Sequence, residues 1–78
     1  MKLKMITRGE AAKLYKKGEK VYIGVYTKKD GGAWWVLDQF AGDAKCVPHT
    51  TGAFEKLARY FNKHYCPGCR TRYAVEVD

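Results

Sequence analysis

The residues best suited to chemistry are three cysteines and a histidine that fall in one stretch of the chain. Two residues separate Cys46 from His49, two separate Cys66 from Cys69, and sixteen lie between the two pairs. Thiolate sulfur and imidazole nitrogen are the usual ligands of structural zinc, and ligand pairs two residues apart are typical of such sites. The spacing alone therefore predicts a four-ligand zinc site.

The segment between the two pairs speaks against that complete site. Residues 51–64 have the pattern of one continuous helix, whose ends would lie roughly 20 Å apart at a rise of about 1.5 Å per residue. Zinc–ligand bonds are only about 2.0–2.3 Å long, so His49 and Cys66 cannot share an ion across that helix. A zinc-stabilised domain with a smaller site remains an alternative, with ligands drawn from Cys66, Cys69, His64 and Cys46.

A second alternative is a dithiol redox protein, because Cys66-Pro67-Gly68-Cys69 has the spacing of a redox motif. In such enzymes a helix N-terminus favours the thiolate of the first cysteine. Here Cys66 follows the C-terminal end of the expected helix, where the dipole opposes a thiolate. We therefore expect a Pro-Gly turn whose cysteines act as small hydrophobic residues or form an adventitious disulfide, and we expect no cofactor.

A basic aromatic surface is the other candidate site. Tyr22 and Tyr26 share one face of an expected strand, and Trp34 or Trp35 joins them across a hairpin. Aromatic rings stack on bases while nearby cations hold phosphate, a combination typical of single-stranded nucleic-acid binding. The alternative is that the aromatics form the core, and one tryptophan must face a helix in any case. The candidate binding residues are Lys20, Tyr22, Tyr26, Lys28, Lys29, Trp34 and Arg72.

The charge is unevenly distributed along the 78 residues. The net charge of +7 divides into +7 over residues 1–29, −2 over residues 30–58 and +2 over residues 59–78. A basic end on a small domain indicates a nucleic-acid or acidic protein partner, or else a solubilising surface. No apolar run approaches the roughly 20 residues that span a bilayer. Three cysteines do not suit a secreted disulfide framework, so we expect a cytoplasmic protein without a membrane partner.

The elements that must position these residues begin with a helix and a hairpin. Thr7-Arg8-Gly9-Glu10 matches a capping box, and Gly18 supplies a stop, which predicts a helix between them. Residues 21–27 and 33–37 have the β-branched and aromatic content of strands, the second extending toward Phe40. The intervening Asp30-Gly31 favours a tight turn, so the two strands form a β-hairpin.

The second half of the chain adds a helix and a strand. Residues 41–48 contain Gly, Asp and Pro and are expected to form a loop. Apolar residues then recur at helical spacing as one buried stripe, comprising Phe54, Leu57, Ala58, Phe61 and Tyr65. Residues 72–77 alternate as a last strand. The sequence thus predicts one α+β domain over residues 1–78, in the order α-β-β-α-β, with a three-stranded, mainly antiparallel sheet packed by the amphipathic helix.

The opening pattern also resembles a group of proteins. The residues that carry the resemblance are Thr7, Glu10, Ala11, Leu14, Tyr15, Gly18, Val21 and Tyr22. They resemble small uncharacterised accessory proteins of bacterial conjugative transposons and phages. The resemblance implies a cytoplasmic bacterial protein of a mobile element, and it brings no catalytic residues with it.

Catalysis has little support in the sequence. Asp38 and Asp43 do not form a convincing acid/base pair, and His49 and His64 lack an identifiable nucleophile. No Gly-rich phosphate loop occurs, because Gly31-Gly32 belongs to the hairpin turn. We therefore predict a non-enzymatic binding module of a mobile genetic element, without a small-molecule substrate, that contacts nucleic acid or an acidic protein surface through its basic aromatic side chains.

Overall fold

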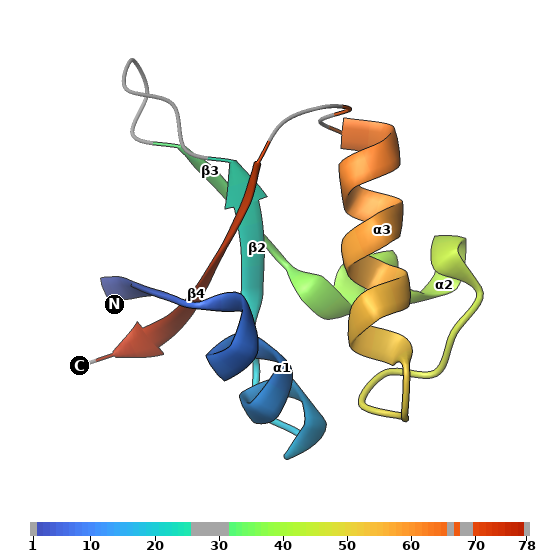
Figure 1. Ribbon diagram of the computed structural model, residues 1–78, viewed down its shortest axis with the longest axis horizontal. Coiled ribbons are helices and arrows are strands. Elements are labelled where there is room, and N and C mark those ends of the chain that lie inside the picture. Colours follow the sequence, from blue (N-terminus) through green and yellow to red (C-terminus); the bar gives the residue numbers. More distant parts are fainter. Residues whose placement is uncertain (1, 26–31, 66, 68–69, 78) are drawn as a thin grey trace.

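A computed structural model of the chain describes residues 2–25, 32–65, 67 and 70–77. Its elements form two layers, an antiparallel sheet and a set of helices packed against it (Figure 1). The strands lie in the order β1-β4-β2-β3, and each neighbouring pair is antiparallel. The elements are β1 (Lys2–Ile6), α1 (Arg8–Lys16), β2 (Tyr22–Val25), β3 (Ala33–Val36), the 3-10 helix η1 (Leu37–Phe40), α2 (Ala41–Ala44), α3 (Ala53–Tyr65) and β4 (Thr71–Val77).

The predicted α+β class with an antiparallel sheet is confirmed, but the predicted number of strands is wrong. The sheet has four strands, because β1 pairs with β4 along its whole length, from Lys2 opposite Val77 to Ile6 opposite Tyr73. Lysines at alternate positions of β1 are typical of a protected sheet edge and weaken the strand signal in the sequence. The expected loop over residues 41–48 is also partly wrong, because α2 occupies its first half.

Local signals predicted the first helix and the pairing of the hairpin. The Thr7 hydroxyl accepts a hydrogen bond from the Glu10 backbone N–H at 3.2 Å, which caps α1 as the sequence predicts. β2 pairs with β3 from Tyr22 opposite Val36 to Val25 opposite Ala33. The predicted extension of β3 toward Phe40 is wrong, because the chain turns into η1 after Val36. The predicted turn, residues 28–32, falls mostly outside the described residues.

The core lies between one face of the sheet and the apolar stripe of α3. Ile23 is in register with both Trp35 and Tyr73, so these three side chains share a sheet face. The Phe54 ring lies 5.3 Å from that of Tyr73, and the Phe61 ring lies 5.4 Å from that of Trp35. Burial of each large apolar side chain stabilises the fold by about 1.5–3 kcal/mol. The predicted stripe is confirmed from Phe54 to Phe61, whose apolar members are buried, but it is wrong at Tyr65, which is 50% exposed in the last turn of α3.

Helix α1 completes the core from the side of β4. Ala11 and Tyr15 are its buried residues, and the Tyr15 ring lies 6.1 Å from that of Phe54. Both α1 and α3 therefore pack on the face that carries Ile23 and Tyr73. Among the described residues, no helix combines the length and the apolar character needed to cross a membrane.

Candidate functional site

The second face of the sheet is built from residues that the pairing register places side by side. Met5 and Tyr22 both lie opposite Ala74, Tyr22 also lies opposite Val36, and Gly24 lies opposite Trp34. Directly paired residues point to the same side of a sheet. We call this surface the open sheet face, and it comprises Leu3, Met5, Tyr22, Gly24, Trp34, Val36, Arg72, Ala74 and Glu76.

The open sheet face has no helical cover within the described part of the chain. The ring contacts and buried residues of α1 and α3 belong to the opposite face, and Figure 1 shows α2 and α3 on one side of the sheet. The Met5 side chain is 53% exposed and that of Leu3 is 36% exposed, whereas Ala74 is fully buried beneath its neighbours. The face therefore combines exposed aliphatic side chains with the partly buried side chains of Tyr22, Trp34 and Val36.

Gly24 lets the indole ring of Trp34 lie close to the strand beneath it. A Cβ atom at position 24 would overlap the Ala33 carbonyl oxygen of the neighbouring strand and would lie 3.0 Å from Cε3 of Trp34. A residue with a side chain would therefore push β3 or the indole away. Glycine at this position keeps the centre of the open sheet face shallow.

One end of the open sheet face is polar, and its two charges, those of Lys20 and Glu76, offset each other. The Tyr22 hydroxyl donates a hydrogen bond to the Glu76 carboxylate, and the Lys20 ammonium lies 3.6 Å from the same carboxylate. The hydrogen bond from Tyr22 is the main reason that the pKa of Glu76 is lowered, and Lys20 adds to the effect. The Lys20 ammonium also lies 5.5 Å from the centre of the Tyr22 ring, within the range of a cation–π contact.

The structure brings part of the predicted binding site together. Tyr22, Trp34 and Arg72 lie on the open sheet face, and Lys20 lies at its polar end. Trp35 points to the other side, against α3. The remaining predicted binding residues, Tyr26, Lys28 and Lys29, lie outside the described residues. Sequence reasoning missed Leu3 and Met5, because it did not predict the strand that carries them.

The residues predicted as zinc ligands are not assembled within the described chain. Cys46 is half-buried against the core, and His64 is exposed in the last turn of α3 with its ring 4.3 Å from that of Tyr60. Cys66 and Cys69 lie outside the described residues. Over the described ranges, no group of three or more His, Cys, Asp or Glu side chains is arranged to hold a metal ion. α3 runs unbroken over 13 residues, about 20 Å at the usual helical rise. The zinc-site alternatives stay predictions, because two of their ligands lie outside the described residues.

Tyr15, Asp38 and His49 form a hydrogen-bonded network at the edge of the core, which the sequence did not predict. The Tyr15 hydroxyl donates to Asp38 Oδ1 at 2.6 Å, and His49 places Nε2 3.1 Å from Asp38 Oδ2 and Nδ1 2.6 Å from the Tyr15 carbonyl oxygen. A carbonyl oxygen only accepts hydrogen bonds, so Nδ1 of His49 carries a proton. Both ring nitrogens are thus engaged by the protein, and neither is available as a metal ligand.

This network joins α1, η1 and the segment before α3. Burial, and then the hydrogen bond to Asp38, raise the pKa of the Tyr15 phenol well above its ordinary value. His49 adopts a left-handed backbone conformation with φ of 63°, which few residues other than glycine and asparagine favour. The three side chains of the network come from distant parts of the sequence, so no local spacing predicts that they meet. The network holds the fold together and presents no nucleophile.

Comparison of the chain with protein-family models, with curated proteins and with solved structures finds no match in any of the three. The chain presents an apolar, partly aromatic sheet face, which ends in the cluster of Lys20, Tyr22 and Glu76. Arg72 lies opposite Gly24, in the row of the face farthest from Glu76 among the described residues. This arrangement suits the binding of another macromolecule.

Proposed function

We propose that the chain is a non-enzymatic binding module that holds an acidic protein partner against the open sheet face. The observation that carries the proposal is the position of Met5, Tyr22 and Trp34 on a sheet face that no described helix covers. Burying such a face against a partner contributes about 25 cal/mol for each Å² of apolar surface removed from water. Because the segment from Thr7 to Tyr22 resembles accessory proteins of conjugative transposons and phages, we propose that the module belongs to a bacterial mobile element.

The side chains of this face favour a protein over a single-stranded nucleic acid. Base stacking requires accessible ring faces, but the Tyr22 ring already has the Lys20 ammonium 5.5 Å from its centre. The Glu76 carboxylate beside it would repel phosphate. Leu3 and Met5 supply exposed aliphatic surface, which packs against apolar protein side chains and offers nothing for a base to stack on.

The charge of the face indicates the character of the partner. Arg72 makes no ion pair with any described residue, and it lies opposite Gly24 near Trp34. A carboxylate on the partner would pair with this guanidinium, and the net charge of +7 would speed the approach of an acidic surface. Two copies of this chain would repel each other by the same charge. The favoured partner therefore has an apolar centre flanked by carboxylates.

The test is site-specific photocrosslinking in cells of the organism that encodes the chain. A photoreactive amino acid replaces Met5 on the open sheet face, and a matched control replaces Gly9, which is exposed on α1 and has open space around its Cβ position. We expect a discrete adduct from position 5 alone that resists nuclease and is destroyed by protease. The protein in the adduct is then identified, purified and bound to the parent chain and to Met5→Glu. We expect Met5→Glu to weaken that binding at least about tenfold, because it buries an unpaired charge.

Other outcomes overturn the proposal. A nuclease-sensitive adduct from position 5 would assign the face to nucleic acid, and an adduct of twice the chain mass would assign it to a second copy. Equal adducts from positions 5 and 9 would show that the face has no selective partner. Unchanged affinity of Met5→Glu for the purified partner would place the interface elsewhere.

A further inference from the structure

Helix α3 presents a row of cations directly opposite its buried stripe. Phe54, Leu57 and Phe61 face the core, whereas Lys56, Arg59 and Lys63 recur at intervals of three and four residues on the other side and are all exposed. We call these three cations the α3 basic stripe. They extend over about 10.5 Å of helix axis at a rise of about 1.5 Å per residue.

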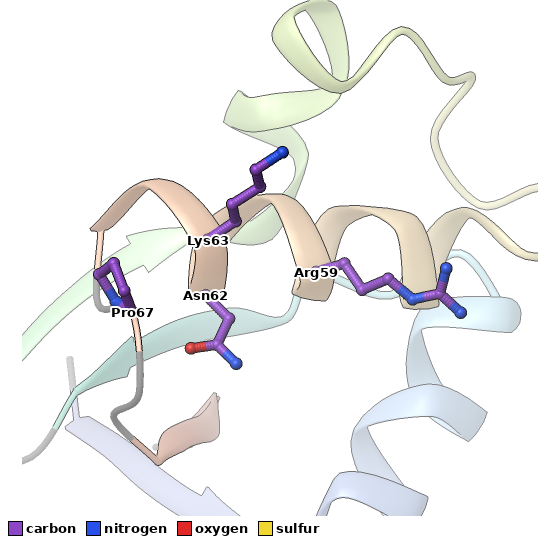
Figure 2. A pocket seen from close by; sticks show the side chains of 4 residues that line it. All are labelled: Arg59, Asn62, Lys63 and Pro67. Atoms are coloured by element: carbon purple, nitrogen blue, oxygen red, sulfur yellow. The ribbon is translucent and has the colours of Figure 1, made fainter.

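The stripe forms a ridge between two shallow hollows. One hollow, of about 320 Å³, is lined by Arg59, Asn62, Lys63 and Pro67. Figure 2 shows Arg59 extended along the helix, with Lys63 and Asn62 leaving it in different directions. The other hollow, of about 310 Å³, lies between α2 and α3, and its lining includes all three cations of the stripe together with Asp43 and Tyr60. A ligand on this ridge would therefore meet Arg59 and Lys63 from either side.

The acidic groups nearest to the stripe are already engaged. Glu55, the only acidic residue of α3, is paired with Arg8 of α1. Asp43 of α2 lies beside Tyr60, where burial and then this carboxylate raise the pKa of the phenol. In the described part of the chain, no carboxylate lies within ion-pair distance of a cation of the α3 basic stripe. The three positive charges are therefore available to an external anion.

A backbone contact orients one end of the stripe. The Lys56 ammonium donates a hydrogen bond to the Lys45 carbonyl oxygen at 3.1 Å, which holds it beside the C-terminal end of α2. Lys45 is itself exposed and cationic, so it adds to the positive field at that end. The arrangement is a linear set of cations of fixed spacing on a convex helix surface.

We propose that the α3 basic stripe binds the phosphodiester backbone of double-stranded nucleic acid. A duplex carries one negative charge for about every 1.7 Å of its axis, so a straight row of cations meets several phosphates at once. The rings beside the three cations, those of Tyr60 and His64, already pack on each other with 4.3 Å between their centres. Rings engaged in this way are poorly placed to stack a base, which favours a duplex over a single strand. The neighbouring exposed residues Glu55 and Asn62 are polar, so the stripe lacks the apolar flank that inserts into a membrane.

The test measures fluorescence anisotropy of a labelled mixed-sequence DNA duplex at several salt concentrations. Three phosphate contacts give a slope of about 2.7 in the plot of log Kd against log salt, so binding weakens about 40-fold between 50 and 200 mM salt. We expect each of Lys56→Gln, Arg59→Gln and Lys63→Gln to lower that slope by about 0.9, and the triple variant to remove the salt-dependent binding.

A second triple variant separates position from net charge. Lys13, Lys16 and Lys17 are exposed cations of α1 and its C-cap, and changing all three to Gln removes the same charge from another surface. We expect this control, and Met5→Glu on the open sheet face, to bind the duplex as the parent does. Equal losses from the two triple variants would overturn the inference in favour of diffuse charge. Tighter binding to single strands or to anionic phospholipid vesicles than to duplex DNA would also overturn the inference. Equal binding of duplex RNA would support it, because the phosphodiester backbone is common to both duplexes.

Discussion

At the scale of single residues, the Tyr15–Asp38–His49 network shows how a polar group is kept inside a small core. The Tyr15 side chain is 2% exposed, yet its hydroxyl is satisfied by Asp38 and its backbone carbonyl by His49. Buried polar groups cost stability unless they are hydrogen-bonded. The network therefore lets a tyrosine contribute its large ring to the core of α1 without leaving an unpaired hydroxyl.

The first prediction concerns Tyr15→Phe, which keeps the ring and removes the hydroxyl. We expect the free energy of unfolding at neutral pH to fall by about 1 to 2 kcal/mol, because Asp38 loses a donor. The folded state raises the pKa of Tyr15 above its ordinary value of 10.0, so it disfavours the phenolate. The stability from the neutral phenol is complete below pH 10 and is lost as the pH rises further. Urea unfolding of both proteins over this alkaline range measures the effect.

Tyr15→Phe and its control, Tyr65→Phe, should differ in how steeply their free energy of unfolding falls above pH 10. Above pH 10 the stability of the parent should fall more steeply than that of Tyr15→Phe, which has no phenol at this site to ionise on unfolding. Tyr65→Phe removes a phenol that is 50% exposed and leaves the network intact, so it should keep the slope of the parent. Identical alkaline slopes for the parent and Tyr15→Phe would contradict the assignment.

At the scale of elements, the β2–β3 hairpin depends on a close approach at Gly24. The neighbouring strand and the Trp34 indole occupy the space that a Cβ atom would need. We expect Gly24→Ala to destabilise the protein by about 1–3 kcal/mol, a range typical of overpacking. Chemical denaturation measures this change.

Gly42→Ala is the matched control for the hairpin prediction. A Cβ atom at position 42 meets nothing within 4 Å, and the residue lies in α2, where alanine is the better helix former. Its stability should equal or slightly exceed that of the parent. Equal destabilisation by the two substitutions would mean that the close approach of β3 to Gly24 does not limit the packing of the hairpin.

The elements that the sequence predicted correctly are those with local signals. The capping box at Thr7 and the apolar spacing of α3 are properties of neighbouring residues, and both helices form where they indicate. β1 has no such signal, because its alternating lysines resemble a solvated segment and only pairing with β4 makes it a strand. The turn into η1 after Val36 likewise depends on burial of Leu37 and Phe40, which requires the assembled core.

The same division applies to the candidate site. The alternation of side chains along the strands predicted that Tyr22 and one tryptophan share the sheet face that points away from the helix. The register identifies Trp34 as that residue and brings Arg72 onto the same face, and neither result follows from spacing alone. The helix predicted between the two ligand pairs forms over Ala53–Tyr65, whereas the zinc-site alternatives stay predictions because Cys66 and Cys69 lie outside the described residues.

At the scale of the whole molecule, the two surfaces lie on opposite sides of a two-layer structure. The open sheet face points away from the helices, and the α3 basic stripe points away from the sheet. A chain with this layout can hold a protein on one layer while it touches a nucleic-acid backbone with the other. In our proposals the duplex contacts the three cations of the α3 basic stripe, whereas the protein partner meets the sheet face mainly through apolar contact.

The measurement that tests the central claim most directly is an NMR titration of the isotope-labelled chain with the crosslinked protein after its purification. We expect the largest shifts at the Leu3, Met5 and Val36 methyl groups of the open sheet face. The Leu57 and Ala58 methyl groups, which belong to α3 and are buried on its core side, should stay unchanged. Shifts confined to Lys56, Arg59 and Lys63, with the sheet-face methyl groups unmoved, would contradict the account.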